Sequence, residues 1–166
     1  VSTQAFAIDP AVVEAAKKEG EVVWYSGMIV NQIVRPISEA FEKKYPGIKV
    51  NAARHVPSEV VLKVQSEAQA GRAQADVFDG STAVFPLMEA GLVEPYKPAG
   101  FEDIPDGLKD PEGKWFAIHY GTLGLFVNVD ALGGAEVPQC FADLTKPEYR
   151  GMVGYLDPSS AFVGYA

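Results

Sequence analysis

The chain has 166 residues, 48% of them hydrophobic, which is enough to bury a core, and its length alone suggests one domain. Its formal net charge of −8 argues against a nucleic-acid or anionic-membrane surface, which needs clustered lysine and arginine, but a small anionic ligand remains compatible with it. No apolar run approaches the roughly 20 residues that span a bilayer, and the single cysteine, Cys140, allows neither an internal disulfide nor a thiolate metal cluster.

A short helix is predicted near the start of the chain, over DPAVVEAAKKEG (9–20). Asp9 can cap this helix, Pro10 suits its first turn, and Gly20 suits its end. The stretch EVVWYS (21–26) is rich in β-branched and aromatic residues, which predicts a buried strand.

An amphipathic helix is predicted next, over QIVRPISEAFEKKYPG (32–47). Ile33, Ile37 and Phe41 recur every four residues and would lie on one face of it. Pro36 belongs in the first turn or kinks the helix there.

The same strand–helix plan then repeats twice. Ser58 is predicted to cap the first of these two helices, and Gly71 and Gly91 to end the first and the second. The alternation predicts right-handed βαβ units on a parallel sheet. The predicted elements are a strand in IKVNA (48–52), a loop in ARHVPS (53–58), a helix in EVVLKVQSEAQAG (59–71), a strand in ADVFD (75–79), a turn in GST (80–82) and a helix in AVFPLMEAG (83–91).

The pattern changes after Gly91. The segment 92–113 contains four prolines and little periodicity, which predicts a long surface connection. KWFAIHYGTLGLFVNVDAL (114–132) predicts two strands broken near Gly121, so that an α/β lobe of four or five strands is complete by about residue 130. A short helix over 140–151 and a further strand in MVGYL (152–156) would then begin something new.

Open parallel sheets bind ligands at the carboxyl ends of their strands, where loops lead into helix N-termini. Hydroxyl groups and glycines occupy these corners, as expected where backbone N–H groups and hydroxyls approach a polar ligand. Any single serine or threonine here could equally be an ordinary helix cap, whereas their recurrence at successive corners favours a ligand site. The corners hold Ser26, Gly27 and Met28 after the first strand, Arg54, His55 and Ser58 after the second, Gly80, Ser81 and Thr82 after the third, Tyr120, Gly121 and Thr122 after a later strand, and Ser159 and Ser160 after the last.

Motifs of the common enzyme classes are absent from the sequence, which contains no GxGxxG, GxxxxGK[ST], GxSxG or HExxH. His119 lies within a predicted strand and is interpreted as a core or sheet-face residue. His55 is either a ligand contact or an exposed loop residue, and Asp79, at a strand end, either touches a ligand or caps its loop. No carboxylate pair is marked out for acid–base chemistry, so no catalytic residue is predicted.

Four stretches of the sequence resemble the extracellular solute-binding proteins, family 1, of ABC importers. They are most similar to the branch that contains ferric-iron, phosphonate, hexose-phosphate and thiamine binders. The resemblance runs from about residue 20 to the last residue, and the order and spacing of the stretches are more specific than any one of them. The stretches are GEVVWYSGM (20–28), EAFEKKYPGIKV (39–50), ADVFDGSTAVFPLMEAGLVEPYKP (75–98) and DLTKPEYRGMVGYLDPSSAFVGYA (143–166).

The resemblance implies the type II periplasmic-binding-protein fold, an α/β fold in which two lobes with parallel-rich sheets are joined by hinge strands and close on a ligand. Residues 1–122 would form the first lobe, residues 123–130 a hinge strand crossing, and residues 131–166 the beginning of the second lobe. The remainder of the second lobe and the returning hinge strands would then lie beyond residue 166.

The resemblance also implies an anion seat in DPSSAF (157–162), where relatives often supply hydroxyl and N–H groups from a helix N-terminus, which carries roughly half a unit of positive charge. Arg54 is a candidate charge partner of the anion. The full candidate set for ligand binding is Ser26, Gly27, Met28, Arg54, Ser81, Thr82, Tyr120, Thr122, Ser159, Ser160 and Ala161.

The sequence departs from the ferric-binding branch in two places. That branch commonly has a histidine just past the first strand and a glutamate just past the third, where this chain has Met28 or Ile29 and Ser81. These are poor ligands for Fe(III), which prefers charged oxygen donors. The paired tyrosines of that branch would lie beyond residue 166. No metal ligand is therefore predicted in this lobe, and an organic or phosphate-bearing anion fits it better.

The implied function is capture of a small polar, anionic ligand and its delivery to an ABC permease in the membrane, with no cofactor, no nucleic-acid partner and no bond made or broken. The protein is expected to be a monomer in the periplasm, or tethered outside the membrane, and the start VSTQAFAIDP resembles that of a mature chain whose signal has been removed. Three alternatives stay open: a ferric-iron-binding importer protein, the ligand-sensing domain of a regulator, which an attached DNA-binding segment would support, and an enzyme on the same fold, which would need a catalytic pair in the cleft.

Overall fold

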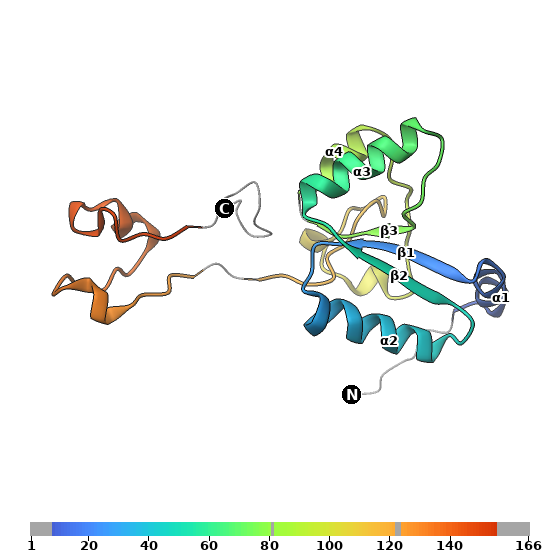
Figure 1. The fold of residues 1–166 in the computed structure, drawn as a ribbon, viewed down its shortest axis with the longest axis horizontal. Coiled ribbons are helices and arrows are strands. Elements are labelled where there is room, and N and C mark those ends of the chain that lie inside the picture. Colours follow the sequence, from blue (N-terminus) through green and yellow to red (C-terminus); the bar gives the residue numbers. More distant parts are fainter. Residues whose placement is uncertain (1–7, 81, 122–123, 156–166) are drawn as a thin grey trace. The chain divides into compact units, whose positions relative to one another are not determined.

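The computed structural model of the chain describes residues 8–80, 82–121 and 124–155. The chain divides into two compact units, Val1–Ile118 and His119–Ala166. The sheet and the α-helices belong to the first unit (Figure 1). Within the described residues, every helix is too short or too polar to cross a lipid bilayer.

A three-stranded parallel sheet forms the centre of the first unit, in the order β2-β1-β3 (Figure 1). Its strands are β1 (Glu21–Ser26), β2 (Lys49–Arg54) and β3 (Val77–Phe78). The last residue of β1, Ser26, lies opposite the last residue of β2, Arg54. The prediction of a parallel α/β sheet is therefore confirmed, and the carboxyl ends of the three strands lie along one edge.

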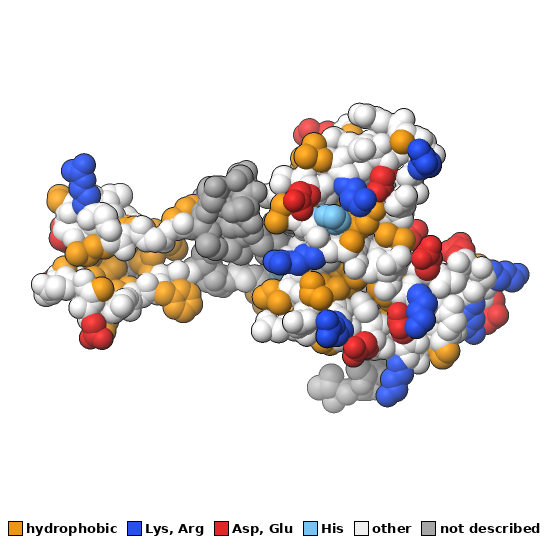
Figure 2. Space-filling model, in the orientation of Figure 1, with side chains coloured by type: hydrophobic (Ala, Val, Ile, Leu, Met, Phe, Trp, Pro, Cys, Tyr) orange, Lys and Arg blue, Asp and Glu red, His pale blue; other side chains and the backbone are white. Residues whose placement is uncertain are grey.

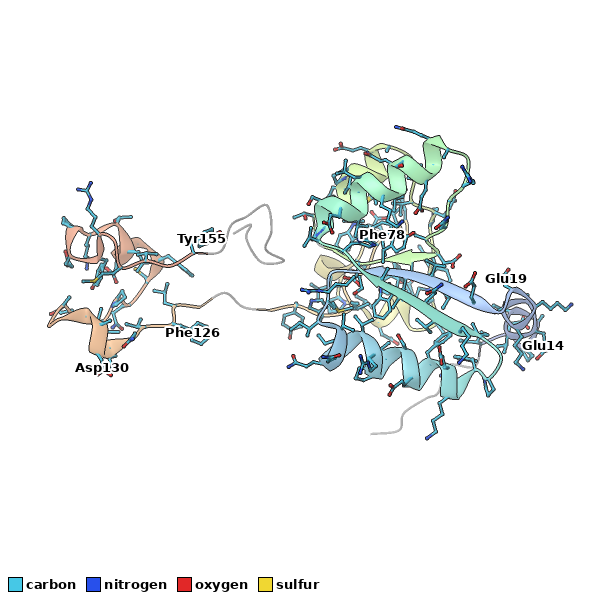
Figure 3. All side chains as sticks on the ribbon, viewed as in Figure 1. Glu14, Glu19, Phe78, Phe126, Asp130 and Tyr155 are labelled. Atoms are coloured by element: carbon cyan, nitrogen blue, oxygen red, sulfur yellow. The ribbon has the colours of Figure 1, made fainter. Side chains whose placement is uncertain are left out.

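Helices cover both faces of this sheet. In Figure 1, α3 (Pro57–Gln69) and α4 (Val84–Glu89) lie on one face and α2 (Arg35–Lys44) on the other. The buried core lies between β1 and the α3–α4 face, where it consists of Tyr25, Val60, Ala83 and Leu87. Phe78 of β3 packs against the same cluster (Figure 3).

The first helix, α1 (Pro10–Glu19), has the ends that the sequence predicts. The Asp9 carboxylate accepts a hydrogen bond from the Ala11 backbone N–H at 2.9 Å, which satisfies one of the free donors of the first turn. Gly20 ends the helix in the left-handed conformation, with φ of 83°.

The helix predicted over residues 32–47 is present, but the prediction of its buried face is wrong. It begins with a π-helical turn, Val30–Val34, in which the Val34 N–H donates to the Ile29 carbonyl five residues back. The wider turn changes which residues face the sheet, so Val34 is 4% exposed and Ile37 is 49% exposed. Pro36 lies at the start of the regular helix α2, as predicted.

Ser58 does not cap α3, contrary to the prediction. The helix begins at Pro57, so Ser58 already lies in its first turn. The Glu59 carboxylate instead accepts a hydrogen bond from the Val56 N–H at 3.2 Å. Proline suits the first helical position because its φ is already helical and its missing N–H is not needed there.

The connection over 92–113 is part of the first unit and is partly buried, rather than lying wholly on the surface as predicted. Phe101, in the 3₁₀ turn Phe101–Asp103, is 3% exposed, and Lys109 is 8% exposed. The Lys109 ammonium donates to the carbonyls of Phe101 and Glu102 at 3.2 Å each. These bonds satisfy a charge that would be costly to bury alone.

The two strands predicted over 114–132 are absent from the described part of that segment. Among the described residues, this segment pairs only through an isolated antiparallel bridge between Phe116 and Lys109. A strand is stabilised by the hydrogen bonds of its neighbours, and no neighbouring strand of the described chain pairs with this segment. The observed sheet accordingly has three strands rather than the predicted four or five.

The second unit contains short 3₁₀ turns in the residues that the structure describes. The helix predicted over 140–151 is replaced by Phe141–Thr145 and Pro147–Tyr149. Tyr149 is 3% exposed, and its hydroxyl donates to the Glu136 carbonyl at 2.7 Å. The strand predicted over 152–156 is not formed in its described residues, 152–155.

Candidate functional site

Three of the five predicted ligand corners meet at the carboxyl edge of the sheet in the first unit. The corners after β1 and β2 are adjacent, because Ser26 pairs with Arg54 and the Ser26 carbonyl accepts from the His55 N–H at 2.9 Å. The corner after β3 is adjacent to β1 on its other side, where the Asp79 N–H donates to the Tyr25 carbonyl at 3.0 Å. The parallel topology thus brings together residues that are far apart in the sequence.

The corner after β1 is closed by Ser26. This side chain has no exposed surface, and its Oγ accepts a hydrogen bond from the Met28 N–H at 3.1 Å. Met28 is itself 6% exposed. Ser26 and Met28 are therefore buried inside the loop. Gly27 is half-buried and Ile29 is 53% exposed, so these two residues form the surface of the corner.

The corner after β2 presents a cation. The side chain of Arg54 is exposed and makes no hydrogen bond or ion pair with any residue in the described ranges. Its neighbour His55 is half-buried, with its ring edge-on to Tyr25 at 5.3 Å between centroids and its Nδ1 3.6 Å from a carboxylate oxygen of Glu59. Arg54 is therefore a charge at this edge that is available to an anion.

The corner after β3 is organised by Asp79, whose carboxylate caps a loop. Oδ1 accepts from the Gly27 N–H at 3.0 Å, and Oδ2 accepts from the Trp24 indole N–H at 2.9 Å. Of the two roles that the sequence allowed for Asp79, the structure shows the loop-capping one. The half-buried Thr82 follows in the same corner, whereas Ser81 lies outside the described residues.

A charged network between β1 and α3 was missed by the sequence analysis. The Tyr25 hydroxyl donates to the Glu67 carboxylate at 2.7 Å, and the Lys63 ammonium lies 3.1 Å from the same carboxylate. Lys63 also lies 5.0 Å from the centre of the Tyr25 ring. Burial, together with the hydrogen bond to Glu67, raises the pKa of the Tyr25 hydroxyl. The spacing of Lys63 and Glu67 on α3 would have indicated their ion pair, but not the tyrosine between them.

The charges on the visible face of the first unit are of both signs. Figure 2 shows acidic and basic side chains interspersed there. This mixture agrees with the net negative charge of the chain and differs from the continuous basic surface of a nucleic-acid-binding protein. In the ranges that the structure describes, no group of three or more histidine, cysteine, aspartate or glutamate residues could hold a metal ion. The same described residues leave no buried side-chain nitrogen or oxygen without a hydrogen-bond partner.

The second unit holds the remaining predicted site residues. Tyr120 is 81% exposed, and the exposed side chains of this unit include Phe126 and Tyr155 (Figure 3). His119, predicted as a core or sheet-face residue, is exposed and lies in no strand. Four predicted residues lie outside the described ranges in this part of the chain: Thr122, Ser159, Ser160 and Ala161.

Residues 72–166 match the family model of the bacterial extracellular solute-binding proteins. An uncharacterized protein of Haemophilus influenzae is 34% identical over 99% of this chain and 49% of its own length. An Fe(3+)-binding periplasmic protein of Serratia marcescens is 26% identical over 83% of this chain and 40% of its own length.

Among solved structures, the periplasmic binding protein AfuA of Actinobacillus pleuropneumoniae, with exogenous fructose 6-phosphate bound, matches with a TM-score of 0.70. It is 30% identical, and the match covers 87% of this chain and 47% of AfuA. The chain thus spans about half the length of the relatives that it matches.

Proposed function

Since the chain belongs to the bacterial extracellular solute-binding proteins and has their type II α/β fold, we propose that it captures a small polar anion in the periplasm and delivers it to the permease of an ABC importer. Binding and release are the whole of this function, with no bond made or broken. The relatives whose names state a function are binding proteins. The protein acts as a monomer, and its partners are the small ligand and the membrane permease.

The observation that carries the proposed anion is the exposed Arg54 side chain at the carboxyl edge, which pairs with no residue in the described part of the chain. A guanidinium donates parallel hydrogen bonds to a phosphate or carboxylate, and such charge-assisted bonds are about twice as strong as neutral ones. In a chain with a net charge of −8, most anions would be repelled unless a local cation received them. A sugar phosphate, a phosphonate or a dicarboxylate has the required group.

The other proposed ligand contacts come from both lobes. In the first lobe, residues 1–122, the candidates besides Arg54 are Gly27, Ser81 and Thr82, while Ser26 and Met28 are buried and support the loop after β1. After the hinge crossing at 123–130, the second lobe contributes hydroxyls and backbone N–H groups. The second-lobe and hinge-side candidates are Tyr120, Thr122, Ser159, Ser160 and Ala161.

Ferric iron is the second candidate ligand, because the Serratia relative is named as an Fe(3+)-binding protein. The first lobe offers little for it: the two positions where a ferric binder carries a histidine and a glutamate hold Met28 or Ile29 and Ser81. Iron would therefore need ligands other than these two positions.

Thermal unfolding of the intact protein against a ligand panel tests the proposal. The panel contains fructose 6-phosphate, inorganic phosphate, a phosphonate, malate, thiamine and ferric citrate. A ligand present at 100 times its dissociation constant stabilises the folded state by about 2.7 kcal/mol, which is readily measured. Stabilisation by an anion is expected, whereas stabilisation by ferric citrate alone would contradict the anion and support the iron alternative.

Arg54→Gln sharpens this test. It should weaken binding of the stabilising anion by about tenfold or more, because hydrogen bonds to charged groups contribute about 1.5–3 kcal/mol. Arg72→Gln is the matched control, since Arg72 is also exposed but follows α3, away from the carboxyl edge. Equal affinities of the two variants, measured by calorimetry, would remove Arg54 from the site.

A further inference from the structure

Asp79 connects two corners of the candidate site through contacts with the protein alone. Its carboxylate accepts one hydrogen bond from the Gly27 N–H at 3.0 Å and another from the Trp24 indole at 2.9 Å. Its own backbone N–H donates to the Tyr25 carbonyl at 3.0 Å. One residue at the end of β3 thus holds the last part of β1 and the loop that follows it.

The loop after β1 depends on side chains for its shape. Its first two N–H groups, those of Gly27 and Met28, donate to the Asp79 carboxylate and to Ser26 Oγ. Of these two bonds, only the one to Asp79 links the loop to a distant part of the chain, the residue that follows β3. Since β3 has just two residues in the sheet, this carboxylate supplies much of the connection between the first and third corners.

We propose that Asp79 is a positioning residue for ligand binding, which holds the Gly27 corner in register with the corner that begins at Gly80. The inference rests on the proposed function, because it concerns how the same site is assembled. Both carboxylate oxygens already accept a hydrogen bond, and a carboxylate would repel an anion at short range. Asp79 therefore acts on the ligand through the loop and not by touching it.

Asp76 provides a matched comparison at the opposite end of β3. Its carboxylate accepts from the Val23 N–H at 2.7 Å, and its own N–H donates to the Val23 carbonyl at 3.0 Å. The two aspartates thus fasten the same short strand to β1 by the same kind of bond. Only Asp79 lies at the carboxyl edge, so a purely structural role predicts similar behaviour for both, whereas a positioning role predicts a difference in ligand affinity.

The experiment compares Asp79→Asn with Asp76→Ala in the intact protein. Asparagine keeps the shape of Asp79 but replaces one acceptor oxygen by an NH₂ group, which then faces a donor, Trp24 or Gly27. Affinity is measured by calorimetry for three probes: inorganic phosphate, fructose 6-phosphate and malate. We expect Asp79→Asn to lose at least tenfold in affinity and Asp76→Ala to stay within twofold of the wild type, even if Asp76→Ala unfolds at the lower temperature.

A second readout follows the loop without any ligand. The indole N–H resonance of Trp24 should shift in Asp79→Asn, and amide hydrogen exchange at Gly27 should become at least tenfold faster. Neither should change in Asp76→Ala, because its lost bond is to Val23. Unchanged exchange at Gly27 in Asp79→Asn would show that the carboxylate does not hold the loop, and would overturn the inference.

The binding outcomes separate the inference from the proposed function. If the wild type binds a probe and Asp79→Asn binds it equally well, or both variants lose affinity equally, the positioning role is wrong and the proposed function stands. If the wild type binds none of the three anions, the proposed function is contradicted, and the inference that depends on it falls as well.

Discussion

At the scale of single residues, many acidic side chains of this chain close corners of the backbone. Each of these carboxylates accepts a hydrogen bond from a main-chain N–H group that would otherwise lack a partner within its turn. The carboxylates concerned are those of Asp9, Glu42, Glu59, Glu67, Asp76, Asp79, Asp110 and Asp143. These carboxylates therefore stabilise the turns of the fold.

The role of a residue at the sheet edge was only partly predictable. For Asp79 the sequence allowed a ligand contact or a loop cap, and the choice depended on Trp24, 55 residues away, whose proximity follows from the strand order. Ser26 was predicted as a ligand hydroxyl because it ends a strand. Helices cover both faces of the sheet, so a residue at a strand end can be buried whichever face it is on.

Glu67→Gln should lower the free energy of unfolding by about 1–2 kcal/mol at pH 7, because it weakens a charge-assisted network of three donors. The donors are the Tyr25 hydroxyl, the Lys63 ammonium and the Gln74 N–H. Urea unfolding measures the loss. Glu14→Gln is the control, because Glu14 is exposed and forms a surface ion pair with Lys17, and it should leave the midpoint unchanged.

The stability loss in Glu67→Gln should also depend on pH. Burial alone would raise the pKa of the Glu67 carboxyl, but the bonds from Tyr25, Lys63 and Gln74 outweigh it and hold this pKa below its ordinary value of 4.5. A carboxyl with a lowered pKa contributes its stability fully above that ordinary value and loses it as the pH falls through the folded-state pKa. The stability difference between wild type and Glu67→Gln should therefore shrink below about pH 4.5. A difference that stayed constant down to pH 3 would contradict the role of the ionised carboxylate.

At the scale of elements, α4 is stable only through its packing. It has six residues and no side-chain cap, and isolated helices of that length do not form in water. Its anchor is Leu87, which is fully buried against Tyr25 and Val60. Because α4 follows the third corner of the site, its packing also fixes where that corner lies.

Leu87→Ala should lower the free energy of unfolding by about 2–5 kcal/mol, the usual cost of a cavity in a packed core. Leu62→Ala on α3 is the matched control, since Leu62 is 67% exposed, and it should change stability by less than about 0.5 kcal/mol. Urea unfolding of both variants gives the comparison. Similar losses in the two would mean that the core is not centred on α4.

Elements with local signals were predictable, and elements that depend on partners were not. Helix α1 has its cap, its proline and its glycine within the sequence that forms it, and all three have the predicted roles. The buried face of α2 depends on a π-turn that hydropathy does not reveal, so Ile37 was misplaced. The segment 114–132 has strand-forming residues, yet a strand also requires a neighbour to pair with.

At the scale of the whole molecule, the chain brings together three of its candidate corners in the first unit and leaves the others to a later part of the sequence. The family resemblance places a second lobe there, and the relatives are about twice as long as this chain. A two-lobed binder gains affinity when the second lobe supplies contacts that the first cannot. The hydroxyl pair at Ser159 and Ser160 is the clearest candidate for such contacts.

Replacing Ser159 and Ser160 together by alanine in the intact protein should weaken anion binding by about tenfold or more, since a hydrogen bond to a charged group contributes about 1.5–3 kcal/mol. The backbone N–H groups of the corner remain, so some affinity should survive. Stability should change little, as it should in the control Ser66→Ala on the exposed side of α3. Calorimetry and thermal unfolding of the same samples separate the two effects. Unchanged affinity together with a lower unfolding temperature would make this corner a helix cap, and the anion would then be held by Arg54 and the first lobe.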